Sequence, residues 1–171
     1  MTKLLYLIRH ATAEEGGNSP MFRDFDRDLT STGIIESARM GKFLSSKGIK
    51  LDLIISSAAE RAKGTAKIFA EQLGIDTETI VIDENLYGGG PRAYLAAVNA
   101  LNESVNSVAI FGHNPDITFF GEYLTRADIG GQMDKAGCLV MQFDDIKWAE
   151  VSSKMGKFVE YHAPRTINPT E

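Results

Sequence analysis

Short apolar runs alternate along this chain with segments whose apolar residues recur every three or four positions. Runs of about four to eight residues are typical of buried strands, and apolar residues at helical spacing indicate helices that pack on a core. The runs predict six strands, at 4–8, 51–55, 80–82, 107–111, 138–143 and 158–162.

Helical spacing predicts four helices among these strands. The helices begin at Thr30 or Thr32, shortly after residues 56–57, at Pro91 and after residues 112–115. Strands that alternate with helices imply right-handed crossovers and parallel pairing. We therefore predict an α/β protein, a three-layer α/β/α sandwich with a mostly parallel central sheet, in a single domain that spans 1–171. The stretch 11–28 has no periodicity and predicts a long loop.

The composition is that of an ordinary globular protein with an acidic balance. Of its 171 residues, 43% are hydrophobic, 24% are charged, and the formal net charge is −5. An acidic chain lacks the broad basic surface that nucleic acid or an anionic membrane requires, so we expect neither as a partner. No signal peptide or membrane-spanning run is visible, and the single Cys138 lies among apolar residues. We predict a cytoplasmic protein whose thiol is buried and inert.

Cationic and imidazole side chains follow three of the predicted strands. Arg9 and His10 end the first, Arg61 comes just after the second, and His113 follows the fourth. Parallel strands bring their carboxyl ends together at the edge of a sheet where ligands bind. Guanidinium groups hold pairs of phosphoryl oxygens, and a neutral imidazole attacks phosphorus. We expect this edge to bind a phosphoryl group, with Arg27 folding over it from the loop.

Four motifs occur in the order of a known family: Leu7-Ile8-Arg9-His10-Ala11, the segment 27–33, the segment from Ser56-Ser57 to Thr65, and Gly112-His113-Asn114-Pro115. With them the chain resembles the histidine phosphatase superfamily, and within it the small phosphohistidine phosphatases of the SixA type. The resemblance extends from about Lys3 to Pro115 and beyond.

The resemblance implies a role for each matching residue. His10 would be the nucleophile that forms a covalent phosphohistidine. Arg9 and Arg61 would hold the phosphoryl oxygens, and His113, protonated with phosphate bound, would add positive charge. Arg27 matches an arginine of this subgroup that binds substrate. Neither a metal nor another cofactor is implied, because Arg and protonated His supply the positive charge.

The chain departs from the family pattern in two places. Ala11 stands where the superfamily usually has glycine, which keeps a small residue there. Many members also carry a glutamate that protonates the leaving group; one alignment puts Gly88 at that place, and another makes Glu84 the acid. SixA-type enzymes also lack the usual acid. That absence favours phosphohistidine as substrate, because its P–N bond needs less help to break than an ester.

The leading hypothesis is a metal-independent phosphatase that hydrolyses phosphohistidine, borne by a signalling or phosphotransfer protein. One alternative is a phosphatase of small phosphate esters, and another is a non-catalytic module that binds a phospho-ligand. In each, phosphate or another oxyanion occupies the pocket. For Arg27 an ion pair with neighbouring aspartates is an alternative. His162 matches no motif and is interpreted as structural or exposed, and Trp148 and the nearby Met155 are interpreted as packing in the core or at an edge.

Overall fold

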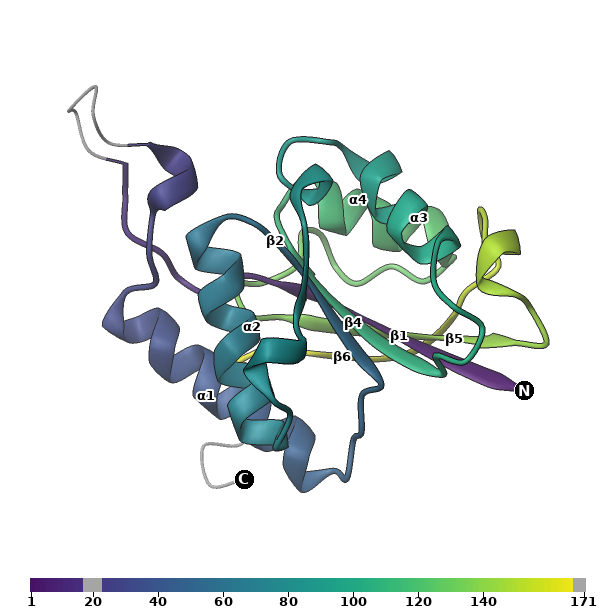
Figure 1. Ribbon diagram of the computed structural model, residues 1–171, viewed down its shortest axis with the longest axis horizontal. Coiled ribbons are helices and arrows are strands. Elements are labelled where there is room, and N and C mark those ends of the chain that lie inside the picture. The colour runs from purple at the N-terminus through teal and green to yellow at the C-terminus, as the bar shows by residue number, and fades with distance from the viewer. Residues whose placement is uncertain (17–22, 168–171) are drawn as a thin grey trace.

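A six-stranded sheet forms the centre of the protein in the computed structural model, which describes residues 1–16 and 23–167 (Figure 1). The strands are β1 (Thr2–Arg9), β2 (Leu53–Ser57), β3 (Val81–Asp83), β4 (Ser107–Gly112), β5 (Cys138–Asp144) and β6 (Lys157–His162). Their order is β3-β2-β4-β1-β5-β6. The pairs from β3 to β1 are parallel, whereas β5 runs antiparallel to both of its neighbours. The prediction of a mostly parallel sheet is confirmed.

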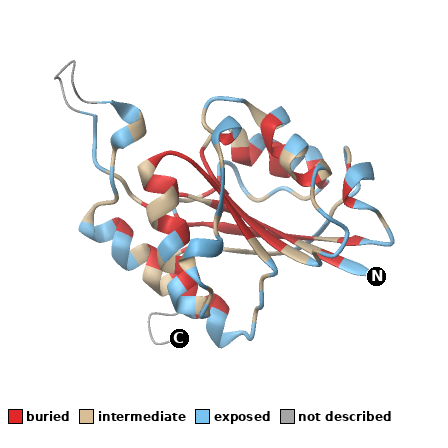
Figure 2. Cartoon of the chain, viewed as in Figure 1, coloured by how far each residue is buried: buried red, intermediate tan, exposed pale blue. Residues whose placement is uncertain are grey.

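Helices cover both faces of this sheet, as the predicted three-layer sandwich requires. The helices are α1 (Ser31–Ser46), α2 (Glu60–Leu73), α3 (Pro91–Asn99) and α4 (Asp116–Leu124), and α1 and α2 lie on the face opposite α3 and α4 (Figure 1). Successive residues of β1 enter different cores: Leu5 and Leu7 pack with α3 and α4, and Tyr6 and Ile8 with α1 and α2. A strand buried on both faces explains the continuous apolar run. Figure 2 shows the buried sheet between the helices.

The predicted boundaries differ from the structure most at the second strand. β2 begins and ends two residues later than predicted, so that Ser56 and Ser57 are paired strand residues, opposite Ile82 and Asp83. Both serines are fully buried, and the Ser56 hydroxyl donates to the Ser57 carbonyl. Hydrophobicity alone could not extend the strand over two polar residues. The side chain of Thr30, not of Thr32, caps α1, because it accepts from the amide of Gly33.

Single helical turns occupy several connections. They are η1 (Asp24–Asp26), η2 (Thr77–Thr79), η3 (Glu84–Leu86) and η4 (Trp148–Glu150). The turn η1 falls inside the predicted loop 11–28, of which residues 17–22 lie outside the described part of the chain. Over residues 1–16 and 23–167, no helix has the length and apolar character needed to cross a membrane.

The arrangement brings three chain segments together at one edge of the sheet. Arg9 at the end of β1 pairs with Gly112 at the end of β4, and the amide of His10 donates to the Gly112 carbonyl at 3.0 Å. β2 lies on the other side of β4 and ends at Ser57. His10, His113 and the start of α2 therefore emerge side by side.

Candidate functional site

His10 is held in one orientation by its own neighbour. Its Nδ1 lies 2.7 Å from the carbonyl oxygen of Ala11, and a carbonyl only accepts, so Nδ1 carries the proton and Nε2 of the neutral ring has a free lone pair. The amide of Ala11 donates to the hydroxyl of Thr65, which donates to the Arg61 carbonyl on α2. Ala11 and Thr65 are fully buried. Two helix positions thus fix the ring that the sequence identifies as the nucleophile.

His113 lies against His10, with 5.3 Å between the ring centroids. Its Nε2 is 2.7 Å from the hydroxyl of Ser57, and its backbone amide donates to the hydroxyl of Tyr94 on α3. The tyrosine approaches so closely that a Cβ at Gly112 would lie 2.0 Å from its oxygen. Glycine at position 112 is therefore required for this contact.

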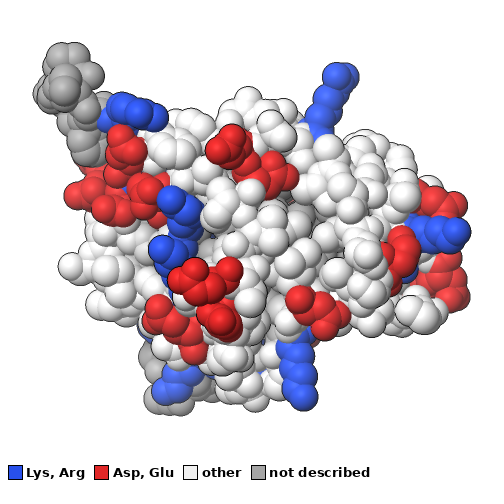
Figure 3. Space-filling model, viewed as in Figure 1, with Lys and Arg blue, Asp and Glu red and all other residues white. Residues whose placement is uncertain are grey.

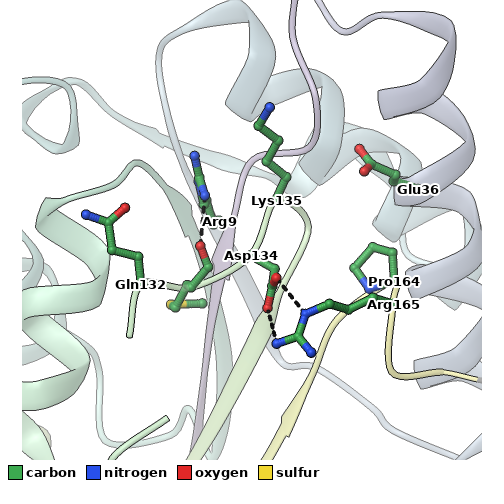
Figure 4. Close-up of a pocket in the computed structure, with 8 residues that line it drawn as sticks. Arg9, Glu36, Gln132, Asp134, Lys135, Pro164 and Arg165 are labelled. Carbon is green, nitrogen blue, oxygen red and sulfur yellow. Dashed lines mark hydrogen bonds and ion pairs between the residues drawn. The ribbon is translucent and has the colours of Figure 1, made fainter. Parts of the chain in front are cut away.

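One terminal nitrogen of Arg9 is anchored to a backbone carbonyl at the edge of the site. Its Nη1 donates to the carbonyl oxygen of Met133 at 2.8 Å, and the same oxygen accepts from the side-chain amide of Asn114. Beyond Arg9 lies an open cleft of about 460 Å³, which Figure 4 shows between α1 and the residues that precede β5. Its wall includes Lys135 and the ion pair of Asp134 with Arg165, whose Nε–Oδ1 distance is 2.9 Å (Figure 4).

Arg61 joins the site from the first turn of α2, where the sequence predicts it. Its two terminal nitrogens donate to Asp24, Nη1 to the carbonyl oxygen at 2.7 Å and Nη2 to the carboxylate at 3.0 Å. Arg27 binds the other oxygen of the same carboxylate at 2.8 Å, and its Nε donates to the Glu14 carbonyl. Arg27 therefore reaches the rim of the site and also forms the ion pair proposed as its alternative role. Figure 3 shows acidic and basic side chains clustered at the end of the molecule where η1 lies in Figure 1.

The deep part of the site carries unused hydrogen-bonding capacity. In the described part of the chain, three buried side-chain nitrogen or oxygen atoms have no partner: Arg9 Nε, Arg61 Nε and His113 Nδ1. All three belong to residues that the sequence assigns to the site. Buried unpaired donors are costly, and their concentration at one place indicates a binding site for an acceptor-rich group.

Both histidines are neutral at neutral pH in this structure. Burial, followed by the positive charges of Arg61, Arg9 and Arg27, lowers the pKa of His10 from 6.5 to about 4, against the opposing effect of the Ala11 carbonyl. Burial and the neighbouring His10 and Arg61 lower the pKa of His113 to about 3. The arginines keep the site positive overall, which suits a dianionic phosphoryl group.

Two residues at the site, Tyr87 and Asp24, were not proposed from the sequence as site residues. Tyr87 packs edge-on against His113 at 5.6 Å between centroids and donates its hydroxyl to Asp24 at 2.6 Å. Glu84, the alternative acid, is exposed and lines a separate hollow with Ile55 and Val81. The alignment that names Glu84 as the acid passes through this segment, but it indicated the glutamate instead of the tyrosine.

The structural predictions for other residues are also resolved. Cys138 is fully buried, and burial raises the pKa of its thiol. Trp148 is fully buried, whereas Met155, which follows it closely in the sequence, is exposed. His162 is half-buried, packs on Phe43 and bonds Glu160.

Comparison with known families finds a match over the part of the chain that holds most of the site. A family model described as the histidine phosphatase superfamily (branch 1) matches residues 5–87. The 2,3-bisphosphoglycerate-dependent phosphoglycerate mutase of Methylobacterium sp. (strain 4-46) is 37% identical over 86 residues, which cover 50% of this chain and 41% of the mutase. The chain thus matches less than half of the mutase's length.

Solved structures match nearly the whole chain. A protein from Agrobacterium tumefaciens, provisionally named a phosphohistidine phosphatase SixA, has a TM-score of 0.78 and 28% identity, over 95% of this chain and 98% of that one. A protein from Nakamurella multipartitia with the same provisional name has a TM-score of 0.78 and 26% identity, over 96% and 97%. Both likenesses extend through β5 and β6, beyond the family-model match.

Proposed function

Because the chain belongs to the histidine phosphatase superfamily, we propose that it is a phosphatase that removes the phosphoryl group from phosphohistidine through a covalent intermediate on His10. The observation that carries the proposal is a set of three buried nitrogens, on Arg9, Arg61 and His113, that have no partner among the described residues and accompany a neutral imidazole with a free lone pair. The set fits the equatorial oxygens of a phosphoryl group, and the lone pair fits attack on phosphorus.

In the first step, the lone pair on Nε2 of His10 attacks phosphorus in line with the departing ring. The P–N bond of the substrate breaks, and its electron pair returns to the substrate nitrogen. If the substrate ring carries a proton on its other nitrogen, it leaves as neutral imidazole. No proton has to be supplied, because the charge gained by His10 equals the charge lost by the substrate ring.

In the second step, water attacks phosphorus and the new P–N bond breaks. Its electron pair returns to Nε2, and the phosphate leaves with both protons of the water. His10 then again has its proton on Nδ1, donated to the Ala11 carbonyl. The bound phosphoryl group favours a proton on His113, since a dianion offsets the burial and arginine charges that lower its pKa.

In the described part of the chain, neither Asp24 nor Glu84 is placed to protonate a leaving group, which supports phosphohistidine over an ester. Glu84 is exposed and lines a separate hollow, and the carboxylate of Asp24 is bound by two arginines and Tyr87. An alkoxide leaving group needs a proton donor, whereas a protonated imidazole does not. The two SixA-named structures support the same substrate class.

A phosphatase of small phosphate esters is the second candidate. The likeness to a phosphoglycerate mutase over half of the chain favours it. Under this proposal, Tyr87 is the group at the site with a proton to give, since its ring packs on His113 and its hydroxyl donates to Asp24.

The proposed partner is a phosphohistidine-bearing protein of the cytoplasm, such as a signalling or phosphotransfer protein. The cleft of about 460 Å³ beside Arg9 supports this, because it adjoins the site and is open to solvent. Its wall offers charges of both signs, on Glu36, Lys135 and Arg165, for contacts with a polypeptide surface.

The test is turnover of two substrates without added metal, a phosphohistidine-bearing protein and p-nitrophenyl phosphate. We expect faster loss of phosphohistidine, abolished in His10→Ala and retained in His162→Ala, which serves as the histidine control. Preference for the ester would favour the second candidate. Turnover of neither, with phosphate still bound, would favour the non-catalytic module.

A further inference from the structure

Asp24 is the carboxylate that contacts the arginines of the site. Its Oδ1 accepts from Arg27 at 2.8 Å, and its Oδ2 accepts from Arg61 at 3.0 Å and from Tyr87 at 2.6 Å. These bonds, that of Tyr87 first, hold the pKa of Asp24 below its usual range, while partial burial opposes them. Asp24 is therefore a permanent negative charge in an otherwise positive site.

The exposed fractions of the side chains indicate that Asp24 lies at the mouth of the site, whereas the histidines and Arg61 lie deeper. The histidines are deep, His10 at 9% and His113 at 8% exposed, and the Arg61 side chain is 7% exposed, whereas that of Asp24 is 50% exposed. Arg61 gives its terminal nitrogens to Asp24 and keeps its buried Nε without a partner. A phosphoryl group held by Nε would lie deeper than the carboxylate. In-line attack from His10 directs the leaving group away from the histidine, toward the mouth.

We propose that Asp24 selects the leaving group, by accepting a hydrogen bond from the ring N–H of a departing imidazole. The inference rests on the proposed phosphohistidine activity and names the residue that would determine it. A negative charge at this point attracts a protonated phosphoimidazole. It repels substrates that carry further carboxylates or phosphates, and it opposes the negative charge that develops on a leaving alcohol.

The contact also promotes bond breaking. A carboxylate stabilises the cationic ring and keeps its second nitrogen protonated to higher pH. That proton makes the ring a neutral leaving group when the P–N electron pair returns to it. The charged and titratable groups that face Asp24 are Arg61 from α2, Arg27 after η1, Tyr87 after η3 and, farther away, His113. None of them replaces a carboxylate as an acceptor for a cationic N–H.

The experiment compares the native protein with Asp24→Asn on a phosphohistidine-bearing protein and on p-nitrophenyl phosphate. The ratio of kcat/KM for phosphohistidine to that for the ester should fall about tenfold or more in the variant, as for a lost hydrogen bond to a charged group. The alkaline limb of kcat/KM for phosphohistidine should move to lower pH, since the substrate ring loses its stabilising anion. Asp26→Asn is the matched control, because that carboxylate is exposed and its ion pair among the described residues, with Arg23 at 3.7 Å, is loose.

Asp24→Glu keeps the charge and should keep the preference, which guards against a general disturbance of η1. An unchanged ratio with an unchanged alkaline limb in Asp24→Asn would overturn the inference and leave Asp24 only to order the arginines. If the native protein turned over the ester alone, the proposed phosphohistidine function itself would fail, and the two failures are thus distinguishable.

Discussion

At the scale of single residues, the proposed chemistry of the site depends on buried nitrogens that have no hydrogen-bond partner among the described residues. Over residues 1–16 and 23–167, Arg9, Arg61 and His113 each have a buried nitrogen without a partner, while another nitrogen of each side chain is anchored, to Met133, Asp24 and Ser57. The anchors fix each side chain before a ligand arrives. Preorganised donors of this kind need no rearrangement when charge develops in a transition state.

The two site histidines should titrate far below ordinary histidines. In NMR titrations of the protein without phosphate, we expect His10 to take up a proton only near pH 4 and His113 near pH 3, because burial and the arginines disfavour the cations. The unfolded chain binds these protons near pH 6.5, so folding stability should fall as the pH drops from about 6.5 toward 4. Titration of either ring near pH 6.5 would contradict the site electrostatics.

Thr65→Val should damage both folding and activity. The change removes the hydroxyl that accepts from the Ala11 amide, and the isosteric valine leaves that amide buried and unpaired, whereas the Arg61 carbonyl keeps its main-chain bond within α2. We expect a loss of about 1–3 kcal/mol in the free energy of unfolding, measured in urea. Thr32→Val, at an exposed position of α1, should be nearly neutral. Equal stability of the two variants would refute the role of Thr65.

Sequence reasoning proposed the residues that follow strands, and Arg27 from the loop, but it missed Asp24 and Tyr87. Arg9, His10 and His113 could be predicted because parallel strands must align their carboxyl ends. Asp24 and Tyr87 could not, because they meet across 63 residues of chain and lie in connections whose course no periodicity describes.

At the scale of elements, the ends of the strands position the side chains of the site. Close packing at those ends determines which residue types fit there. β4 ends at Gly112 because Tyr94 from α3 occupies the space of a side chain and binds the next amide, that of His113. The apolar pattern predicted β4 to within one residue. It could not show why glycine ends the strand, since that depends on a helix packed across the sheet.

Gly112→Ala should therefore disturb the site from a residue that touches no substrate. Its Cβ would lie 2.0 Å from the Tyr94 oxygen, which must move and release the His113 amide. We expect about 1–3 kcal/mol of destabilisation, as for other overpacked positions, with a fall in kcat. Gly16→Ala is the control, because no atom of residues 1–16 or 23–167 lies within 4 Å of its added Cβ. A fully stable and active Gly112→Ala protein would contradict the packing described.

At the scale of the whole molecule, an acidic protein encloses a cationic pocket. The net charge is −5, yet three arginines converge on two neutral histidines. The overall charge sets which macromolecules approach, and the pocket sets which group binds. The fold class was predictable from the alternation of strands and helices, whereas the order of β5 between β1 and β6 depends on long-range pairing that no local pattern encodes. The single domain of 1–171 stays a prediction.

Phosphate and orthovanadate should stabilise the folded protein through this pocket. At about 100 times the dissociation constant, a ligand that binds only the native state adds about 2.7 kcal/mol, which a thermal melt detects. Arg61→Ala should abolish the gain, whereas Arg92→Ala, at an exposed position of α3, should keep it. A chelator such as EDTA should change neither stabilisation nor turnover. Equal stabilisation of both arginine variants would place the anion outside this site.

The most direct test of the account is capture of the phosphoryl group on His10. The protein would be mixed for milliseconds with a phosphohistidine-bearing protein, quenched in alkali to preserve P–N bonds, and digested for mass spectrometry. The account predicts a phosphoryl group on the peptide that contains His10, at a level that rises and decays within one turnover and is absent in His10→Ala. Rapid release of phosphate with no adduct on His10 would contradict it.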